Sequence, residues 1–199
     1  MKRLVTHPEN PQTRHIQAAA EALGDGDLII YPTDSVYGLG CDLFNKNGIE
    51  KIYQHKGYDK RKFLSFICPD LKGISEYAYV PDFAYKIMRR LLPGPYTFIL
   101  AATKRVPRIL LEKRKTVGIR VPDCVVCQSL LAEFGRPIIS TSARLAGQSF
   151  LSDPDEIAET FGHFAEIFLD SGPGGLELST VIDFTGDEPV IVREGKGKL

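Results

Sequence analysis

The sequence has no apolar run long enough to cross a bilayer. Its longest runs, such as Phe98 to Ala102, fall far short of the roughly 20 residues that a spanning helix needs. The amino terminus, Met1-Lys2-Arg3 followed by mostly polar residues, lacks the apolar core of a secretory signal. Cysteine is also scarce, and the four present do not indicate a disulfide scaffold. We therefore expect a cytoplasmic protein without a membrane partner, whose cysteines stay as thiols.

An excess of charge of either sign is absent too, because 25 Lys and Arg residues face 25 Asp and Glu residues. This balance argues against a protein that binds nucleic acid by bulk electrostatics, so any RNA contact must be local. The best local candidate is the basic stretch from Lys104 to Lys115, which only Glu112 opposes. A solvated loop and helix face is the alternative interpretation of that stretch.

Standard phosphate-binding and zinc-binding motifs are missing. The chain has no Gly-x-x-x-x-Gly-Lys-Ser/Thr loop and no Gly-x-Gly-x-x-Gly fingerprint, so neither explains a nucleotide site. Cys124-Val-Val-Cys127 has C-x-x-C spacing, but no second pair and no nearby histidine complete a zinc set. We interpret these cysteines as packing in a helix, and we predict no metal-ligating residues.

Helical and strand patterns alternate along the 199 residues, a length that suits one domain. We predict a single α/β domain over residues 1–199, with a twisted, mixed, largely parallel open sheet and flanking helices. Helices are expected from Asn10 and Pro11 to Gly24, over 48–55, 82–92 and 123–134, and from Pro154 behind an Asp153 cap. Strands are expected over 27–33, 63–68, 97–102, 116–121, 137–141, 167–169, 180–184 and 190–193.

The stretch from Tyr31 to Gly40 is a hydrophobic strand end that runs into polar residues. Thr33 and Ser35 supply short hydroxyls that can hold a small polar ligand. Gly38 and Gly40 allow backbone to approach backbone or ligand without a Cβ clash. A tight turn with self-capping hydroxyls is the alternative.

The stretch from Pro137 to Gly147 repeats this pattern. Ser140, Thr141 and Ser142 follow an apolar strand, and consecutive hydroxyls are natural donors to a phosphate or carboxylate. Arg144 could add a bidentate fork for a phosphate. A plain surface turn is the alternative here.

Several basic residues could face a polyphosphate. They are Lys56, Lys60, Arg61, Lys62, Arg120 and Arg193. A lone Lys or Arg is usually solvated surface, but Arg120 lies in the apolar run Val117 to Val121 and therefore needs a partner. Either a carboxylate or a ligand must satisfy it.

Taken in order, these motifs resemble those of the YrdC-like family, whose members make threonylcarbamoyl-AMP from threonine, bicarbonate and ATP with magnesium. The matching motifs cover nearly the whole chain. They are Pro32-Thr33-Asp34 with Gly38-Leu39-Gly40, Lys56-Gly57, Pro93 to Phe98, Gly118 to Pro122, Ser140 to Ala143, Ser179 to Asp183, and Val192 to Gly195. The resemblance implies the YrdC-like form of the mixed sheet, with a central cavity.

The resemblance also implies roles for individual residues. The L-threonine pocket would comprise Thr33, Arg120, Ser140 and Thr180, with Arg120 anchoring the amino-acid carboxylate. The nucleotide would contact Lys56, Tyr58, Lys62, Ser142, Arg144 and Arg193. Of these, Lys56, Lys62 and Arg193 would hold the departing pyrophosphate with Mg²⁺ and so serve catalysis. ATP, L-threonine and bicarbonate are the expected substrates, and downstream tRNA-modification proteins are candidate partners.

Two departures from the family pattern point to its YciO-like branch. Where the family usually has Lys-x-Arg, this sequence has Lys56-Gly57-Tyr58, and where it usually has Ser-x-Asn, this sequence has Ser142-Ala143-Arg144. A phosphate-binding arginine is thereby lost. Our hypothesis is that Arg144 restores the missing positive charge from the other side of the pocket.

Three functions remain open at this stage. The first is synthesis of threonylcarbamoyl-AMP for the threonylcarbamoyladenosine modification of tRNA. The second is binding of double-stranded RNA, tRNA or the ribosome with little or no synthase activity, which the stretch from Lys104 to Lys115 motivates. The third, carbamoyl transfer as in hydrogenase-maturation proteins, ranks lowest because this chain has no paired C-x-x-C set.

Overall fold

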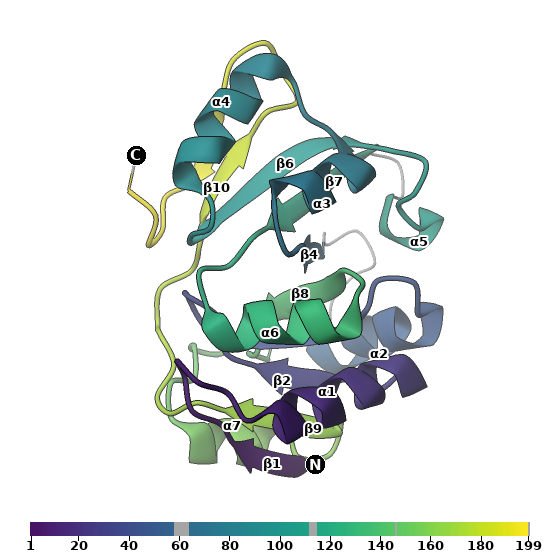
Figure 1. Ribbon diagram of the computed structural model, residues 1–199, viewed down its shortest axis with the longest axis vertical. Helices are drawn as coiled ribbons and strands as arrows, with labels where there is room; N and C mark the ends of the chain where they lie inside the picture. Colours follow the sequence, from purple (N-terminus) through teal and green to yellow (C-terminus); the bar gives the residue numbers. More distant parts are fainter. Residues whose placement is uncertain (58–63, 112–114, 146, 199) are drawn as a thin grey trace.

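The computed structural model describes residues 1–57, 64–111, 115–145 and 147–198 (Figure 1). Within these ranges one mixed sheet of eleven strands runs the length of the molecule, in the order β1-β9-β2-β3-β8-β4-β7-β6-β10-β11, with β5 paired to β6. The predicted α/β class and mixed sheet are confirmed. Parallel pairing is less common than predicted, because β1–β9, β2–β9, β4–β7 and β6–β10 are parallel and the remaining six described pairings are antiparallel.

Most predicted strands are present, although several are shorter than predicted. The strands are β1 (Lys2–Val5), β2 (Ile29–Tyr31), β3 (Gly38–Asp42), β4 (Ser65–Ile67), β5 (Ala78–Tyr79), β6 (Tyr96–Ala102), β7 (Thr116–Arg120), β8 (Ile138–Ser142), β9 (Ile167–Asp170), β10 (Thr180–Asp183) and β11 (Val190–Arg193). The sequence reading missed β1, β3 and β5. At Gly38 and Gly40 the sequence indicated either a close approach of the backbone or a tight turn, and the structure has there a strand, β3, that is fully buried between β2 and β8.

The helices flank this sheet. They are α1 (Thr13–Asp25), α2 (Lys46–Lys56), α3 (Leu71–Tyr77), α4 (Asp82–Leu91), α5 (Arg108–Leu111), α6 (Val125–Phe134) and α7 (Pro154–Phe161). The Asp153 cap of α7 is confirmed. The predicted ends of α1 were wrong, because Gln12 precedes its first residue and Gly26, not Gly24, ends it in the left-handed conformation at φ 90°. None of the described helices combines the length and apolarity that a membrane span requires.

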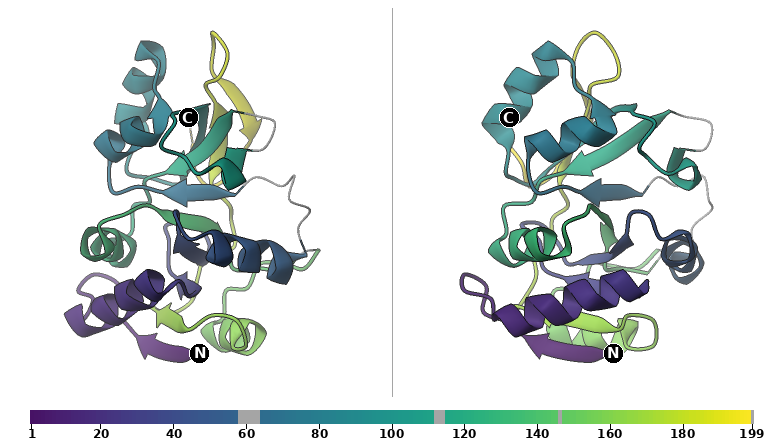
Figure 2. Two further views of the ribbon diagram at one scale, coloured as in Figure 1. Left: turned by 90° about the vertical axis from the view of Figure 1, so that its right-hand side faces the viewer. Right: turned by 45° about the vertical axis from the view of Figure 1, so that its right-hand side comes forward.

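Two apolar clusters lie on opposite faces of the sheet. Helices α1 and α6 pack together on one face, where they contact Ile29 and Tyr31. Helices α2 and α7 cover the other face, where they belong to the cluster that contains Ile30 (Figure 2). Successive strand residues point to opposite faces, so β2 is apolar throughout because both of its faces are covered. Most of the predicted site residues come instead from the β2–β3 turn, from β7, β8 and β11, and from the segment after β8.

Candidate functional site

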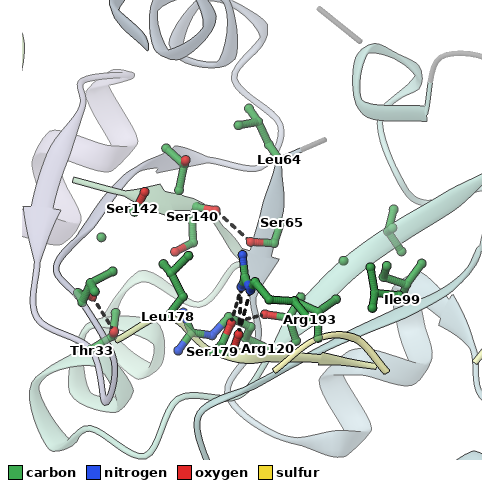
Figure 3. A pocket seen from close by; sticks show the side chains of 18 of the residues that line it. Thr33, Leu64, Ser65, Ile99, Arg120, Ser140, Ser142, Leu178, Ser179 and Arg193 are labelled. Carbon is green, nitrogen blue, oxygen red and sulfur yellow. Dashed lines mark hydrogen bonds between the residues drawn. The ribbon is translucent and has the colours of Figure 1, made fainter. Parts of the chain in front are cut away.

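A cavity of about 700 Å³ brings together residues that lie far apart in the sequence. Six of the predicted site residues line it: Thr33, Arg120, Ser140, Ser142, Arg144 and Arg193. They come from the turn after β2, the ends of β7 and β8 with the segment after β8, and the end of β11. Figure 3 shows the hydroxyls of Ser140 and Ser142 on one side of the cavity and the apolar Ile99 on the other. The cavity is therefore lined by both polar and apolar side chains.

The β2–β3 turn is both self-capped and part of the cavity wall. The Thr33 hydroxyl donates to the Val36 carbonyl oxygen at 2.6 Å and accepts from the Ser35 amide at 3.1 Å. Glycine is required in β3, because a Cβ at Gly40 would lie 2.4 Å from the Ile139 carbonyl oxygen. The predicted close approach of backbone to backbone is thus confirmed. It brings β3 against β8, so that Thr33 and Ser142 line one cavity.

Arg120 forms an ion pair with the carboxylate of Asp34. Its Nη2 donates to Asp34 Oδ1 at 2.7 Å and to Ser35 Oγ at 3.0 Å, and both side chains of the ion pair are less than a tenth exposed. The Nε of Arg120 is buried and has no hydrogen-bond partner among the described residues. A buried donor without a partner costs free energy. The Arg120 side chain also lines the cavity, so its charge would attract an anion there. Asp34 was missed in the sequence reading, although it lies between the two hydroxyl residues.

Lys56 is a buried cation that does not line the cavity. It is 1% exposed, and its Nζ donates to the carbonyl oxygens of Ser142, at 2.6 Å, and Arg144, at 2.5 Å. The ammonium thus binds the main chain at the end of β8 and just after it. The sequence reading expected Lys56 to contact phosphate, but its described contacts are with the backbone that carries Arg144.

Arg193 closes another side of the cavity. Its Nε and Nη2 donate to the Ser179 carbonyl oxygen at 3.1 and 2.8 Å, and Nη2 also reaches Ser179 Oγ at 3.2 Å. Desolvation, followed by the nearby positive charge of Arg120, lowers the pKa of Arg193 from its ordinary value. Two neighbouring arginines in the lining of one cavity favour an anionic ligand there.

Thr180 lies outside this lining. Its hydroxyl donates to the Gly197 carbonyl oxygen at 2.6 Å and accepts from the Gly195 amide at 3.0 Å. It therefore fastens the carboxyl-terminal segment to β10. The predicted contacts of Tyr58, Lys60, Arg61 and Lys62 lie outside the described residues.

Other lining residues were not singled out from the sequence. The hydroxyl of Ser65, a lining residue, donates to the Ser140 carbonyl oxygen at 2.9 Å. Ser179 exchanges a 2.8 Å hydrogen bond with Thr97. The apolar lining residues are Leu64, Ile99, Val117, Leu178, Val181 and Val192. Alternation along β6, β7, β10 and β11 could have identified these apolar positions only if the strand pairing had been known.

The cysteines do not take part in this site. Cys124 precedes α6 and Cys127 is buried within it, and burial raises the pKa of both thiols. Within the described ranges, no three His, Cys, Asp or Glu side chains gather in a group that could hold a metal ion. The interpretation of Cys127 as a packing residue fits its place in the core cluster of α1 and α6.

The fold and the site together define an α/β domain with a cavity at strand ends, lined by hydroxyls and arginines. The family model Sua5_yciO_yrdC, described as "Telomere recombination", matches residues 21–195. The chain therefore belongs to the Sua5/YciO/YrdC family, as the motifs predicted.

Relatives in two branches of this family are similar to the chain. The uncharacterized protein YciO of Escherichia coli K12 is 45% identical over 195 residues, which cover 97% of this chain and 95% of that protein. Threonylcarbamoyl-AMP synthase of Vibrio vulnificus YJ016 is 32% identical over 158 residues, covering 78% of this chain and 85% of the synthase.

Solved structures agree with this grouping. The crystal structure of E. coli YciO gives a TM-score of 0.95 at 43% identity, covering 99% of this chain and 97% of that chain. Pyrococcus abyssi Sua5 complexed with L-threonine gives a TM-score of 0.91 at 29% identity, covering 98% of this chain and 58% of that chain. The similarity extends across the whole cavity, because its lining residues fall within the matched region.

Proposed function

We propose that this protein is a threonylcarbamoyl-AMP synthase-type nucleotidyltransferase, which converts L-threonine, bicarbonate and ATP to threonylcarbamoyl-AMP and pyrophosphate. The observation that carries the proposal is the convergence of Thr33, Ser140, Ser142, Arg120 and Arg193 on one cavity. Relatives named as threonylcarbamoyl-AMP synthases support it, at 32% identity for the V. vulnificus enzyme. The product would serve the threonylcarbamoyladenosine modification of tRNA, through downstream modification proteins.

Arg120 would receive the carboxylate of threonine. Asp34 accepts from one nitrogen of the guanidinium, and the Arg120 side chain, which lines the cavity, would offer its remaining donors to an incoming anion. The hydroxyls of Thr33 and Ser140, which line the same cavity, would then contact the polar groups of the amino acid.

The reaction would proceed in two steps. The neutral threonine amine first attacks carbon dioxide derived from bicarbonate, and the net reaction forms a carbamate and releases one water molecule. A carbamate oxygen then attacks the α-phosphorus, and the bond to the β-phosphate breaks so that pyrophosphate leaves with the electron pair. Arg193, Arg144 and Ser142 line the cavity and would hold the phosphates, together with Lys62, and no covalent enzyme intermediate is needed.

Mg²⁺ would enter with the nucleotide. Because the described residues contain no cluster of metal-ligating side chains, the fit is to an ion carried mainly by triphosphate oxygens and water. Its charge would add to that of the arginines in stabilising the leaving pyrophosphate. The protein's own contribution would be to hold the carbamate oxygen and the α-phosphorus of ATP in a fixed relative orientation.

The decisive experiment mixes the purified protein with ATP, Mg²⁺, bicarbonate and L-threonine. Threonine-dependent pyrophosphate release and a carbamoyl adenylate detected by mass spectrometry are expected. Arg193→Gln should lose both signals, whereas Arg105→Gln, which alters an exposed arginine paired with Glu76, should keep them. Pyrophosphate release that is the same without threonine would refute the proposal.

A second candidate function is RNA binding on the connection between β6 and β7. Four cations on this connection are exposed: Lys104, Arg105, Arg108 and Lys115. The ion pair of Arg105 with Glu76 reduces the net charge there. Binding of double-stranded RNA or tRNA through phosphates would weaken steeply as salt increases. A gel shift over a salt series tests this, and a shift that salt does not alter would count against it.

A further inference from the structure

The main chain at the end of β8 and just after it is fixed by several hydrogen bonds. The Ala143 amide donates to the Tyr37 carbonyl oxygen at 2.7 Å, and the Arg144 amide donates to the Ser142 carbonyl oxygen at 2.8 Å. Lys56 Nζ adds bonds to the carbonyl oxygens of Ser142 and Arg144. A cation that is 1% exposed therefore fixes the backbone from which the Arg144 side chain leaves.

The Arg144 guanidinium is also positioned. It stacks on the Phe150 ring, with 4.3 Å between Cζ and the ring centroid, and its Nη1 donates to the Gln148 carbonyl oxygen at 3.2 Å. Stacking holds the plane of the guanidinium without using its hydrogen-bond donors. The ring thus orients the plane while most of the donors stay available.

One of those donors is conspicuous. Arg144 Nε is buried and has no hydrogen-bond partner in the described part of the chain, although the side chain lines the cavity. Leaving a charged donor unsatisfied is costly, and a shift of the side chain toward an oxyanion in the cavity would relieve that cost. Because Ser142 lines the cavity two residues away, a tetrahedral anion there could receive both a hydroxyl and a guanidinium donor.

We propose that Arg144 is the phosphate-binding cation on this side of the cavity, and that Lys56 is a positioning residue that acts through it. This inference rests on the proposed function only in taking a nucleotide phosphate as the natural ligand. The family resemblance implies that Lys56 and Arg144 both contact the nucleotide, whereas this inference gives the two residues different roles. The lysine holds the main chain, and the arginine on that main chain holds the anion.

Calorimetry with ATP, pyrophosphate and adenosine tests the role of Arg144. Arg144→Ala should weaken ATP and pyrophosphate binding about tenfold or more, as expected for a lost charge-assisted hydrogen bond. Adenosine binding should stay the same, because it has no phosphate. The matched control is Arg136→Ala, since Arg136 also stacks on a phenylalanine, with 4.6 Å to the Phe134 ring, but lies outside the cavity lining.

A double-mutant cycle tests the role of Lys56. If Lys56 acts through Arg144, Lys56→Met should weaken ATP binding in the wild type and have almost no further effect in Arg144→Ala. Losses that simply add would show that Lys56 contacts phosphate directly, and would overturn its role as a positioning residue. Lys56→Gln, which keeps one donor for a backbone carbonyl, replaces Lys56→Met if that variant does not fold.

The outcomes separate this inference from the proposed function. Unchanged ATP and pyrophosphate affinity in Arg144→Ala would overturn the inference, while the synthase assay of the wild type could still succeed. Conversely, Arg144-dependent pyrophosphate binding by a protein that makes no carbamoyl adenylate would uphold the inference and refute the proposed function.

Discussion

Arg120 Nη2 lies 2.7 Å from Asp34 Oδ1, and this ion pair joins the end of β7 to the β2–β3 turn. The second oxygen of Asp34 accepts from the Asp123 amide at 2.9 Å. The main-chain oxygen of Asp34 accepts from Lys196 Nζ at 2.6 Å. One aspartate therefore links the turn, the segment before α6 and the carboxyl-terminal segment beside the cavity.

Removing the charge of Asp34 should destabilise the protein strongly. Asp34→Asn leaves the Arg120 cation buried without its carboxylate, which should lower the free energy of unfolding by about 3 kcal/mol. Urea denaturation measures this change. The matched control is Asp155→Asn, because Asp155 pairs with Arg3 but its side chain is 83% exposed, so its loss should have little effect. An equal decrease in the free energy of unfolding of the two variants would contradict the conclusion that burial makes the Arg120–Asp34 pair more important for stability.

Two glycines should respond to alanine in opposite ways. At Gly40 a Cβ would lie 2.4 Å from the Ile139 carbonyl oxygen and 2.8 Å from the Tyr31 ring, so Gly40→Ala should cost about 3 kcal/mol of stability. Gly24 lies within α1 and has nothing within 4 Å of its Cβ position. Gly24→Ala should therefore stabilise the protein by about 0.5 kcal/mol.

Thermal or urea unfolding of both glycine variants gives the comparison. A destabilised Gly24→Ala would indicate that α1 ends at Gly24, as the sequence first indicated. A stable Gly40→Ala would indicate that β3 and β8 are not as close as described.

Periodicity and turn residues predicted the elements that have a local signal. The Asp153 cap before Pro154 is one example, and the strand ending at Thr141 and Ser142 is another. Strand β3 was not predictable in this way, because Gly38 and Gly40 suggest a turn until the Tyr31 ring is known to lie against them. Local sequence gives no information about such a tertiary contact.

For the site, too, local features were predictable and tertiary contacts were not. The kinds of residue were predictable, since hydroxyls and arginines at strand ends indicate an anion site. The partners were not, because the Arg120–Asp34 pair spans 86 residues and the Lys56–Ser142 contact also spans 86 residues. Only the folded chain distinguishes a lysine that holds backbone from one that faces a ligand.

Stability should fall in alkali because of the buried thiols. Burial raises the pKa of Cys41, Cys68, Cys124 and Cys127 above their ordinary value of 9.0. Below that value both states keep the proton and no stability is lost. Above it the unfolded chain releases protons that the folded chain retains, so the free energy of unfolding falls as pH rises.

Cys127→Ala isolates one of these thiols. In urea unfolding between about pH 8 and about pH 10, its decline with pH should be shallower than that of the wild type, by up to about 1.4 kcal/mol per pH unit. Any constant loss from the smaller side chain does not alter this slope. Identical slopes would contradict the raised pKa of the Cys127 thiol.

Thr180 and Thr33 should behave differently when their hydroxyls are removed. Thr180→Val breaks the hydrogen bonds to Gly197 and Gly195, so it should increase amide hydrogen exchange in the carboxyl-terminal segment. The KM for L-threonine should stay within about twofold, because a residue outside the cavity makes no substrate contact. Thr33→Val alters a residue that lines the cavity and should raise that KM about tenfold, as expected when a hydrogen-bond partner of a bound ligand is lost. A KM raised equally by both substitutions would place the Thr180 hydroxyl in the threonine pocket, as the family resemblance first suggested.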